Sequence, residues 1–164
     1  MGLTFEFFKL CGVLFSTFIA LHYYTALSDI LRSRFLPKKM PLEFLDFLFF
    51  LILVVAGYLS FIGLRSLLYR FMNLDSAPRI SKIGGLILGL VRGFFLIGLL
   101  TFTLAISSVS YFRDSVKSSY LGSRAVTISP WTYNWLLNNI VIKFSAQEKF
   151  NPTVSEVTGR MSQK

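Results

Sequence analysis

The chain has 164 residues, of which 54% are apolar and only 15% are charged, and its formal net charge is +9. A soluble domain carries about 25% charged residues and a disordered chain has low hydrophobicity, so the composition argues against both classes. The basic excess suits nucleic acid or anionic lipid, and the long apolar runs favour lipid. One cysteine, Cys11, excludes an intramolecular disulfide. With one histidine, His22, it also excludes a cysteine/histidine zinc site, so we expect no metal and no cofactor.

Three apolar stretches are long enough to cross a bilayer, which requires about 20 mostly apolar residues. They cover residues 10–28, 47–64 and 84–112, and only the third contains a charge, Arg92. We therefore predict an all-α fold, in which residues 1–128 form an integral membrane bundle of three transmembrane helices. A secretory signal peptide is the alternative for the first stretch, but bulky residues at its end do not suit a cleavage site.

The sequence pattern predicts a C-terminal amphipathic helix over residues 129–150. A Ser-Pro pair opens this segment, as is typical of a helix N-terminus. The predicted apolar face comprises Tyr133, Leu136, Leu137, Ile140, Val141 and Phe144. Trp131 and Trp135 at the start suit a helix that lies at the membrane interface, and the alternative is a helix that packs on the protein's own loops. We expect residues 151–164 to form a flexible polar tail.

A strip of glycines marks one face of the third span. Gly85, Gly89 and Gly93 recur every four residues, and small residues at this spacing let a second helix approach closely. The strip predicts a helix-packing contact, either with a helix of the same chain or with another copy. The alternative is that glycine is simply frequent in membrane helices.

Arg92 lies beside this strip, ten residues after Lys82. That separation is about 15 Å of helix, which places Arg92 near mid-membrane if Lys82 marks the surface. A charge there usually faces a protein partner or a water-filled cavity. In the second interpretation, which we favour, the helix enters the membrane late and Arg92 snorkels to the surface. No acidic residue lies inside the three stretches, so we expect no relay of paired carboxylates.

The sequence contains few residues in arrangements that could catalyse a reaction. His22, Tyr23 and Tyr24 suit an interfacial belt or packing better than a pH-sensing role. The serines after the third span have no histidine or carboxylate arranged around them as an activated nucleophile requires. A glycine-rich phosphate loop is also missing from the sequence. We therefore expect that the protein is not an enzyme.

Several strings of the sequence resemble the colicin V production protein family. They are residues 18–25, which include His22, Tyr23 and Tyr24; residues 82–93, which include Lys82 and Arg92; and residues 117–121, which include Ser118. The resemblance extends over about residues 5–130. It implies a small protein of the bacterial inner membrane, from a family that usually has four spanning helices and a cytoplasmic C-terminus. The family is named for a requirement in secreting a bacteriocin, and no enzymatic reaction is established for it.

Two departures from the family pattern affect what the resemblance implies. The family ordinarily begins with a further spanning helix, so this chain is either a shortened member or has an incomplete start. Glu6 takes the acidic position that follows the turn after that helix. The family also tends to have Asp-Arg where this chain has Ser81-Lys82. A salt bridge from that aspartate is therefore not expected here.

The resemblance and the composition together suggest two functions. The first is an inner-membrane protein that supports bacteriocin production or export, or envelope integrity, without catalysing a reaction. The alternative is a channel or small transporter subunit that assembles through its glycine-rich third helix. The expected partners are the lipid bilayer, including anionic lipids, and either a second copy or other envelope proteins. Nucleic acid is not expected.

Charge predicts the orientation, because basic residues concentrate on the cytoplasmic side of a membrane. With three spans, the first loop and the start of the tail share one side and carry seven basic residues, against five on the other side. We therefore expect the C-terminus in the cytoplasm, where a fluorescent reporter fused to it would be active. Activity of a periplasm-specific phosphatase fused at the same position would contradict this orientation.

Overall fold

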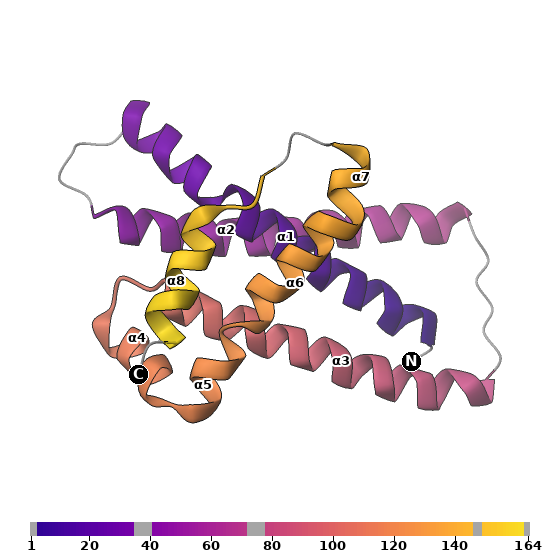
Figure 1. Cartoon of the computed structure of the whole chain (residues 1–164). Coiled ribbons are helices and arrows are strands. Elements are labelled where there is room, and N and C mark those ends of the chain that lie inside the picture. Colours follow the sequence, from indigo (N-terminus) through magenta and orange to yellow (C-terminus); the bar gives the residue numbers. More distant parts are fainter. Residues whose placement is uncertain (1–2, 35–40, 72–77, 146–148, 163–164) are drawn as a thin grey trace.

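The computed structural model describes residues 3–34, 41–71, 78–145 and 149–162, and every regular element within these ranges is a helix (Figure 1). The predicted all-α class is therefore confirmed. Two of the basic residues used to predict the orientation, Lys38 and Lys39, lie outside the described residues.

Three long helices form the membrane part of the protein. They are α1 (Leu3–Arg34), α2 (Leu42–Phe71) and α3 (Pro78–Ala105). The segments of these helices that are long and apolar enough to span a membrane are Phe5–Arg34, Leu42–Leu67 and Ile83–Ala105. The first two contain the predicted spans at 10–28 and 47–64. Acidic residues in the first turns of α1 and α2 favour helix starts at these places.

The third span is shorter than the predicted range of 84–112. α3 ends at Ala105, and the chain turns before α4 (Ser110–Ser118) begins. In this turn the Ser107 hydroxyl accepts a hydrogen bond from the Val109 N–H at 3.2 Å. Serine side chains that bind nearby backbone groups compete with helix continuation, which explains why the apolar run outlasts the helix.

α1 packs against both other spans, whereas α2 and α3 scarcely contact each other. The contact with α2 is close at Gly57, where an added Cβ would lie 3.1 Å from the Cα of Ser16. In the same place the Ser16 hydroxyl donates a hydrogen bond of 2.6 Å to the Val54 carbonyl. Close backbone approach at a glycine, with a polar bond beside it, is typical of helix association in membranes.

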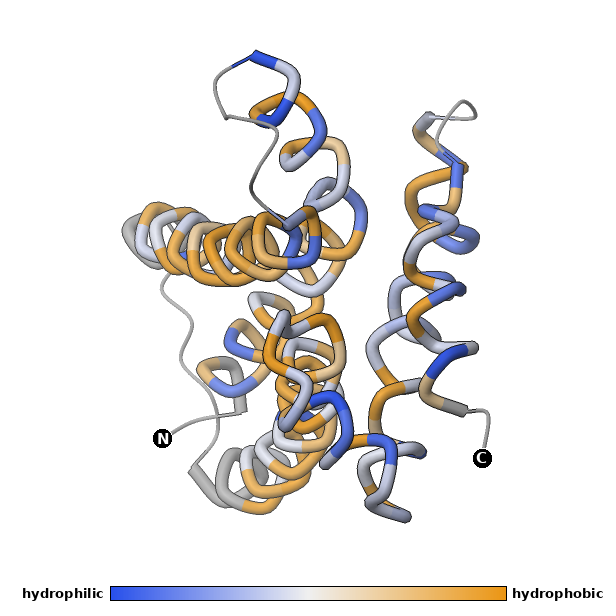
Figure 2. Tube along the Cα trace, turned by 90° about the vertical axis from the view of Figure 1, so that its left-hand side faces the viewer, coloured by the Kyte–Doolittle hydropathy of each residue, from blue (hydrophilic) through white to orange (hydrophobic). Residues whose placement is uncertain are grey.

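Most residues along α2 and α3 are hydrophobic (Figure 2), and many of their large apolar side chains are exposed. On α3, for example, Leu86, Leu90 and Leu100 are exposed. Apolar patches of this extent are unusual on soluble monomers and indicate a surface that lipid or a partner covers. The surface therefore agrees with the spanning length of these helices.

The rest of the chain forms a second layer on one side of the three spans (Figures 1 and 2). After α4, its helices are α5 (Tyr120–Ala125), α6 (Ile128–Leu136), the π-helical turn η1 (Leu137–Val141), α7 (Ile142–Phe144) and α8 (Pro152–Ser162). α6 packs on α1 and α3, so it lies on the spans rather than on loops. Its tryptophans, Trp131 and Trp135, are exposed.

The predicted amphipathic helix at 129–150 differs from the structure in length and in its buried face. Helix α7 ends at Phe144. Tyr133, Leu136 and Leu137 are buried as predicted, but Ile140 and Phe144 are exposed. The π-helical turn explains the difference, because its i→i+5 bonds rotate the residues within it and after it away from the face set by the α-helical period.

The prediction of a flexible tail at 151–164 is wrong for residues 152–162, which form α8. Val154 and Met161 of this helix are buried in the same core cluster as Phe102 of α3. Their spacing places both on one helix face, so even a mostly polar segment can pack when a core receives that face.

Candidate functional site

A cluster of three charged side chains joins α1 to α3. Arg92 Nη1 lies 2.8 Å from Glu6 Oε2, and Lys9 Nζ lies 2.9 Å from Glu6 Oε1. Glu6 is 8% exposed, and the Arg92 side chain is 25% exposed. Phe5 adds a contact with α2, because the Lys9 ammonium and the Arg65 guanidinium lie 4.1 and 4.0 Å from its ring centroid. The start of α1 thus contacts Arg65 of α2 and Arg92 of α3, in addition to its own Lys9.

The structure gives Arg92 a partner that the sequence analysis did not identify, while its depth in the membrane, and so the choice between the two interpretations, stays a prediction. Arg92 lies inside the spanning segment Ile83–Ala105 and pairs with an acidic residue. Removing a charge from water is costly unless a partner compensates it, which the carboxylate of Glu6 does. The sequence did not identify this partner because Glu6 lies outside the predicted span at 10–28. The signal that could have identified Glu6 as the partner is that it is an acidic residue at the start of an apolar helix.

A groove of about 530 Å³ opens beside this cluster, between α2 and α3. Lys9 and Arg92 lie at one end, and the remaining wall includes Ser16, Tyr58 and Leu96. Within the described part of the chain, the buried Nε of Arg92 has no hydrogen-bond partner. The groove exists because both helices pack on α1 and leave a gap between themselves. It combines an apolar wall with a basic end.

His22 joins α1 to the C-terminal layer. Its Nδ1 lies 2.8 Å from the Tyr133 hydroxyl, which also accepts a hydrogen bond of 3.2 Å from the Asn151 N–H. The side-chain amide of Asn151 also binds α1, because it donates a hydrogen bond of 2.9 Å to the Leu21 carbonyl. The ring of Phe18 stacks on the imidazole with centroids 5.3 Å apart. These contacts give His22 a packing role between layers.

The two tyrosines that follow His22 have opposite surroundings. Tyr23 is 43% exposed, and its ring meets the His22 ring edge-on at 4.5 Å. Tyr24 is 1% exposed and packs edge-on against Phe50 of α2, with centroids 5.6 Å apart. An interfacial belt suits the exposure of Tyr23 but not the burial of Tyr24.

The glycine strip does not pack within the described part of this chain at the two positions where the surroundings are known. A Cβ added at Gly89 or Gly93 would have no heavy atom within 4 Å among the described residues. The close contact on α3 is instead at Gly98, where an added Cβ would lie 2.6 Å from the Cβ of Ile128. Gly98 does not fit the four-residue repeat that includes Gly85, which explains why spacing did not reveal it. Packing of the strip against another copy stays a prediction.

The remaining residues of the family strings add no further site. Ser118 lies at the end of α4, where its hydroxyl donates to the Ser115 carbonyl at 3.3 Å. Lys82 lies in α3, but its side chain is outside what the structure describes. Across the described ranges, no group of three His, Cys, Asp or Glu side chains could hold a metal ion.

We expect Glu6→Gln to lower stability in detergent more than Arg92→Gln does. Glu6→Gln leaves Lys9 and Arg92 without their shared anion, which costs about 3 kcal/mol, the low end for a broken buried pair because Arg92 keeps some exposure. Arg92→Gln still leaves Glu6 paired with Lys9. The thermal unfolding temperatures of the purified variants in one detergent would measure the difference.

The control for this comparison is Glu156→Gln. Its carboxylate is 64% exposed and lies 3.8 Å from Arg160. An exposed pair of this kind contributes about 0–1 kcal/mol, so the unfolding temperature should hardly change. Equal effects of Glu6→Gln and Glu156→Gln would show that the charge cluster does not hold α1 to α3.

The comparisons with known proteins identify the family. A family model described as "Colicin V production protein" matches residues 1–130. No curated protein and no solved structure matches the chain. The matched region contains all three spanning helices, the charge cluster, His22 and the glycine strip. With this match over most of its length and three helices that could cross a membrane, the chain is a membrane protein that belongs to the colicin V production protein family.

Proposed function

We propose that this protein is an accessory protein of the bacterial inner membrane that supports bacteriocin production or export, or wider envelope integrity, without catalysing a reaction. The family match over the spanning helices carries this proposal. The arrangement of the polar residues supports it, because Glu6, Arg92 and His22 each bind another helix of the same chain. Residues engaged in this way hold a scaffold together and suit a protein that acts by binding other envelope components.

The proposed orientation places the C-terminus in the cytoplasm. The end of α1, which carries Arg32 and Arg34, and the start of α4, which carries Arg113, then face the inner leaflet. Basic residues next to a span are attracted to anionic headgroups by about 1 kcal/mol each. Anionic lipids of this leaflet are therefore the proposed lipid partners.

A deletion strain that also carries a bacteriocin operon tests the accessory role. We expect less bacteriocin in the medium and greater sensitivity to detergents and bile salts, both restored by the wild-type gene. Glu156→Gln should restore both phenotypes, whereas Glu6→Gln should restore them poorly because its helix contact is broken. Unchanged release together with unchanged sensitivity in the deletion strain would reject the proposal.

A channel or small transporter subunit is the second candidate function. The open face at Gly89 and Gly93 and the groove between α2 and α3 favour it. In an assembly, the glycine face would receive a helix of a second copy and the grooves would remain as polar-ended passages. Solute or ion flux in liposomes that contain only the purified protein would support the channel, and absence of flux would favour the accessory role.

We expect Gly89→Leu to disrupt assembly without unfolding the monomer. Overpacking a filled interface costs about 1–3 kcal/mol, which weakens association by about fivefold to 150-fold. Within the monomer the new side chain meets open space. Cross-linking in membranes would measure the assembly, and thermal unfolding in detergent would measure the monomer.

Two variants serve as matched controls for Gly89→Leu. Leu90→Ala lies about 100° around the helix and should change neither assembly nor stability much. Gly98→Leu should destabilise the monomer itself, because Ile128 occupies the space that the side chain needs. A cross-linking pattern of Gly89→Leu that equals that of the wild type would show that the strip faces lipid.

A further inference from the structure

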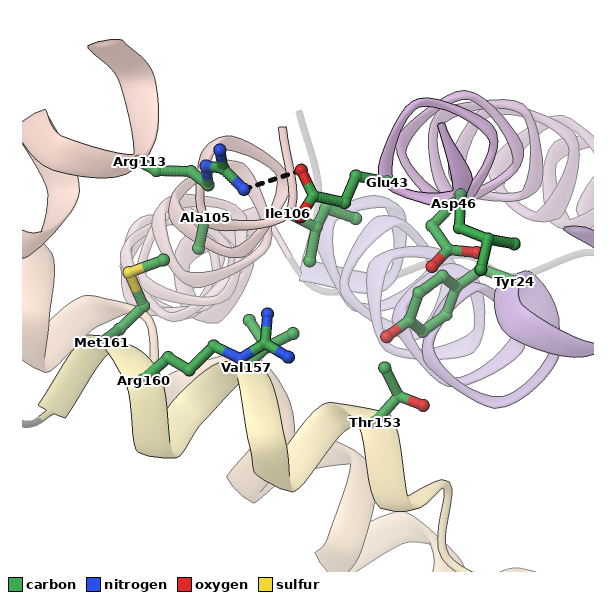
Figure 3. Close-up of a pocket in the computed structure, with 11 residues that line it drawn as sticks. Tyr24, Glu43, Asp46, Ala105, Ile106, Arg113, Thr153, Val157, Arg160 and Met161 are labelled. Atoms are coloured by element: carbon green, nitrogen blue, oxygen red, sulfur yellow. Dashed lines mark hydrogen bonds and ion pairs between the residues drawn. The ribbon is translucent and has the colours of Figure 1, made fainter. Parts of the chain in front are cut away.

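A second cavity, of about 220 Å³, lies where α1, α2 and α8 meet the end of α3 (Figure 3). Its polar lining consists of Tyr24, Glu43, Asp46, Arg113, Thr153 and Arg160. A drug-sized ligand usually occupies about 300–1,000 Å³, so this cavity suits a smaller molecule or a single headgroup. Neither the charge cluster nor the groove between α2 and α3 extends into it.

The Tyr24 hydroxyl indicates that something fills this cavity. Tyr24 is almost completely buried, yet among the described residues its hydroxyl has no hydrogen-bond partner. Buried polar groups nearly always have a partner, and exceptions in a native structure require an explanation. Figure 3 shows this hydroxyl turned toward α8, which carries Thr153 and Arg160. A ligand between α1 and α8 would supply the missing partner.

The charges around the cavity have both signs and are divided between its walls. On the α2 side, Asp46 accepts a hydrogen bond from the Ser28 hydroxyl, and a carboxylate has acceptor capacity beyond one bond. On the α8 side, the Arg160 side chain is 68% exposed, and its ion pair with Glu156 of the same helix is long, at 3.8 Å. Glu43 and Arg113 already pair with each other at 2.8 Å. The free binding capacity is thus acidic at Asp46 and basic at Arg160.

The cavity lies near the membrane surface. α2 begins at Leu42 and α3 ends at Ala105, so the wall is built from the ends of two spanning segments on the same side. Headgroups occupy this level of a bilayer, outside a hydrocarbon core of about 30 Å. A ligand that combines a cation and an anion at this depth matches the lining better than a purely anionic or apolar one.

We propose that this cavity binds a phosphoethanolamine group. Asp46 receives the primary ammonium, which can donate up to three hydrogen bonds. The Tyr24 hydroxyl and the Arg160 guanidinium donate to the phosphate oxygens, and Thr153 lies beside them on α8. Two sources have this chemistry, the headgroup of a membrane lipid and free phosphoethanolamine. The site does not depend on the accessory role or on the channel, since neither uses this cavity.

Native mass spectrometry of the purified full chain tests the headgroup preference. The probes are three lipids with the same acyl chains and with phosphoethanolamine, phosphocholine or phosphoglycerol headgroups. We expect preferential retention of the phosphoethanolamine lipid, because a trimethylammonium cannot donate hydrogen bonds to Asp46 and glycerol carries no cation. Equal retention of all three lipids would overturn the proposal.

Thermal unfolding in detergent with free phosphoethanolamine distinguishes the two sources. Stabilisation by the free compound alone assigns the site to a soluble metabolite, and stabilisation by the lipid alone assigns it to the membrane. Both results support the proposed chemistry. No stabilisation and no retention from either source would leave only water in the cavity and would overturn the proposal.

Two substitutions at the site complete the test. Tyr24→Phe removes only the hydroxyl and should weaken binding about three- to tenfold, as expected for one hydrogen bond. Arg160→Gln removes a charge-assisted bond on an exposed helix face and should weaken binding about tenfold. Tyr23→Phe, at the exposed neighbour, is the control and should bind like the wild type. Wild-type binding by both Tyr24→Phe and Arg160→Gln would overturn the assignment to this cavity.

Discussion

The rest of the structure depends on the contacts of α1, because α2 and α3 scarcely contact each other. Within lipid no hydrophobic force draws helices together, so close packing and polar bonds have to do so. α1 supplies both kinds of contact. Ser16 meets the backbone of α2 at Gly57, and Glu6 pairs with Arg92 of α3. A change in α1 therefore acts on two interfaces at once, and the groove between α2 and α3 follows from the same arrangement.

The C-terminal layer is also attached through α1, and Asn151 is the residue that connects the two. Its side-chain oxygen accepts a hydrogen bond of 3.2 Å from the Thr153 N–H, as an N-cap does at the start of a helix. Its amide donates to the Leu21 carbonyl and to the Thr25 hydroxyl, at 2.9 and 3.0 Å. One side chain thus both begins α8 and fixes it on the span. This explains how a short, mostly polar helix has a defined place over the cavity at Tyr24.

The sequence predicted what depends on local composition and failed where distant contacts decide. The three spans could be predicted because long apolar runs have few other structural solutions in a membrane. The partner of Arg92 could not, because Glu6 comes near only when α1 packs on α3. The exposed position of Phe144 depends on a π-helical turn that the residue pattern did not predict. α8 was missed because its order comes from Asn151 and from burial of Val154, not from helix propensity.

The glycines of α3 show that spacing alone does not reveal what a small residue does. Gly98 is required by the monomer, because the side chain of Ile128 fills the space beside it. Gly89 and Gly93 face open space within the described chain, although they have the regular spacing. An open glycine face costs little in lipid, because lipid tails cover it without loss of hydrophobic burial. The open glycine face does lack close contact with the backbone of another helix. The strip can therefore receive a second helix without any change in the monomer, which separates the requirements of assembly from those of folding.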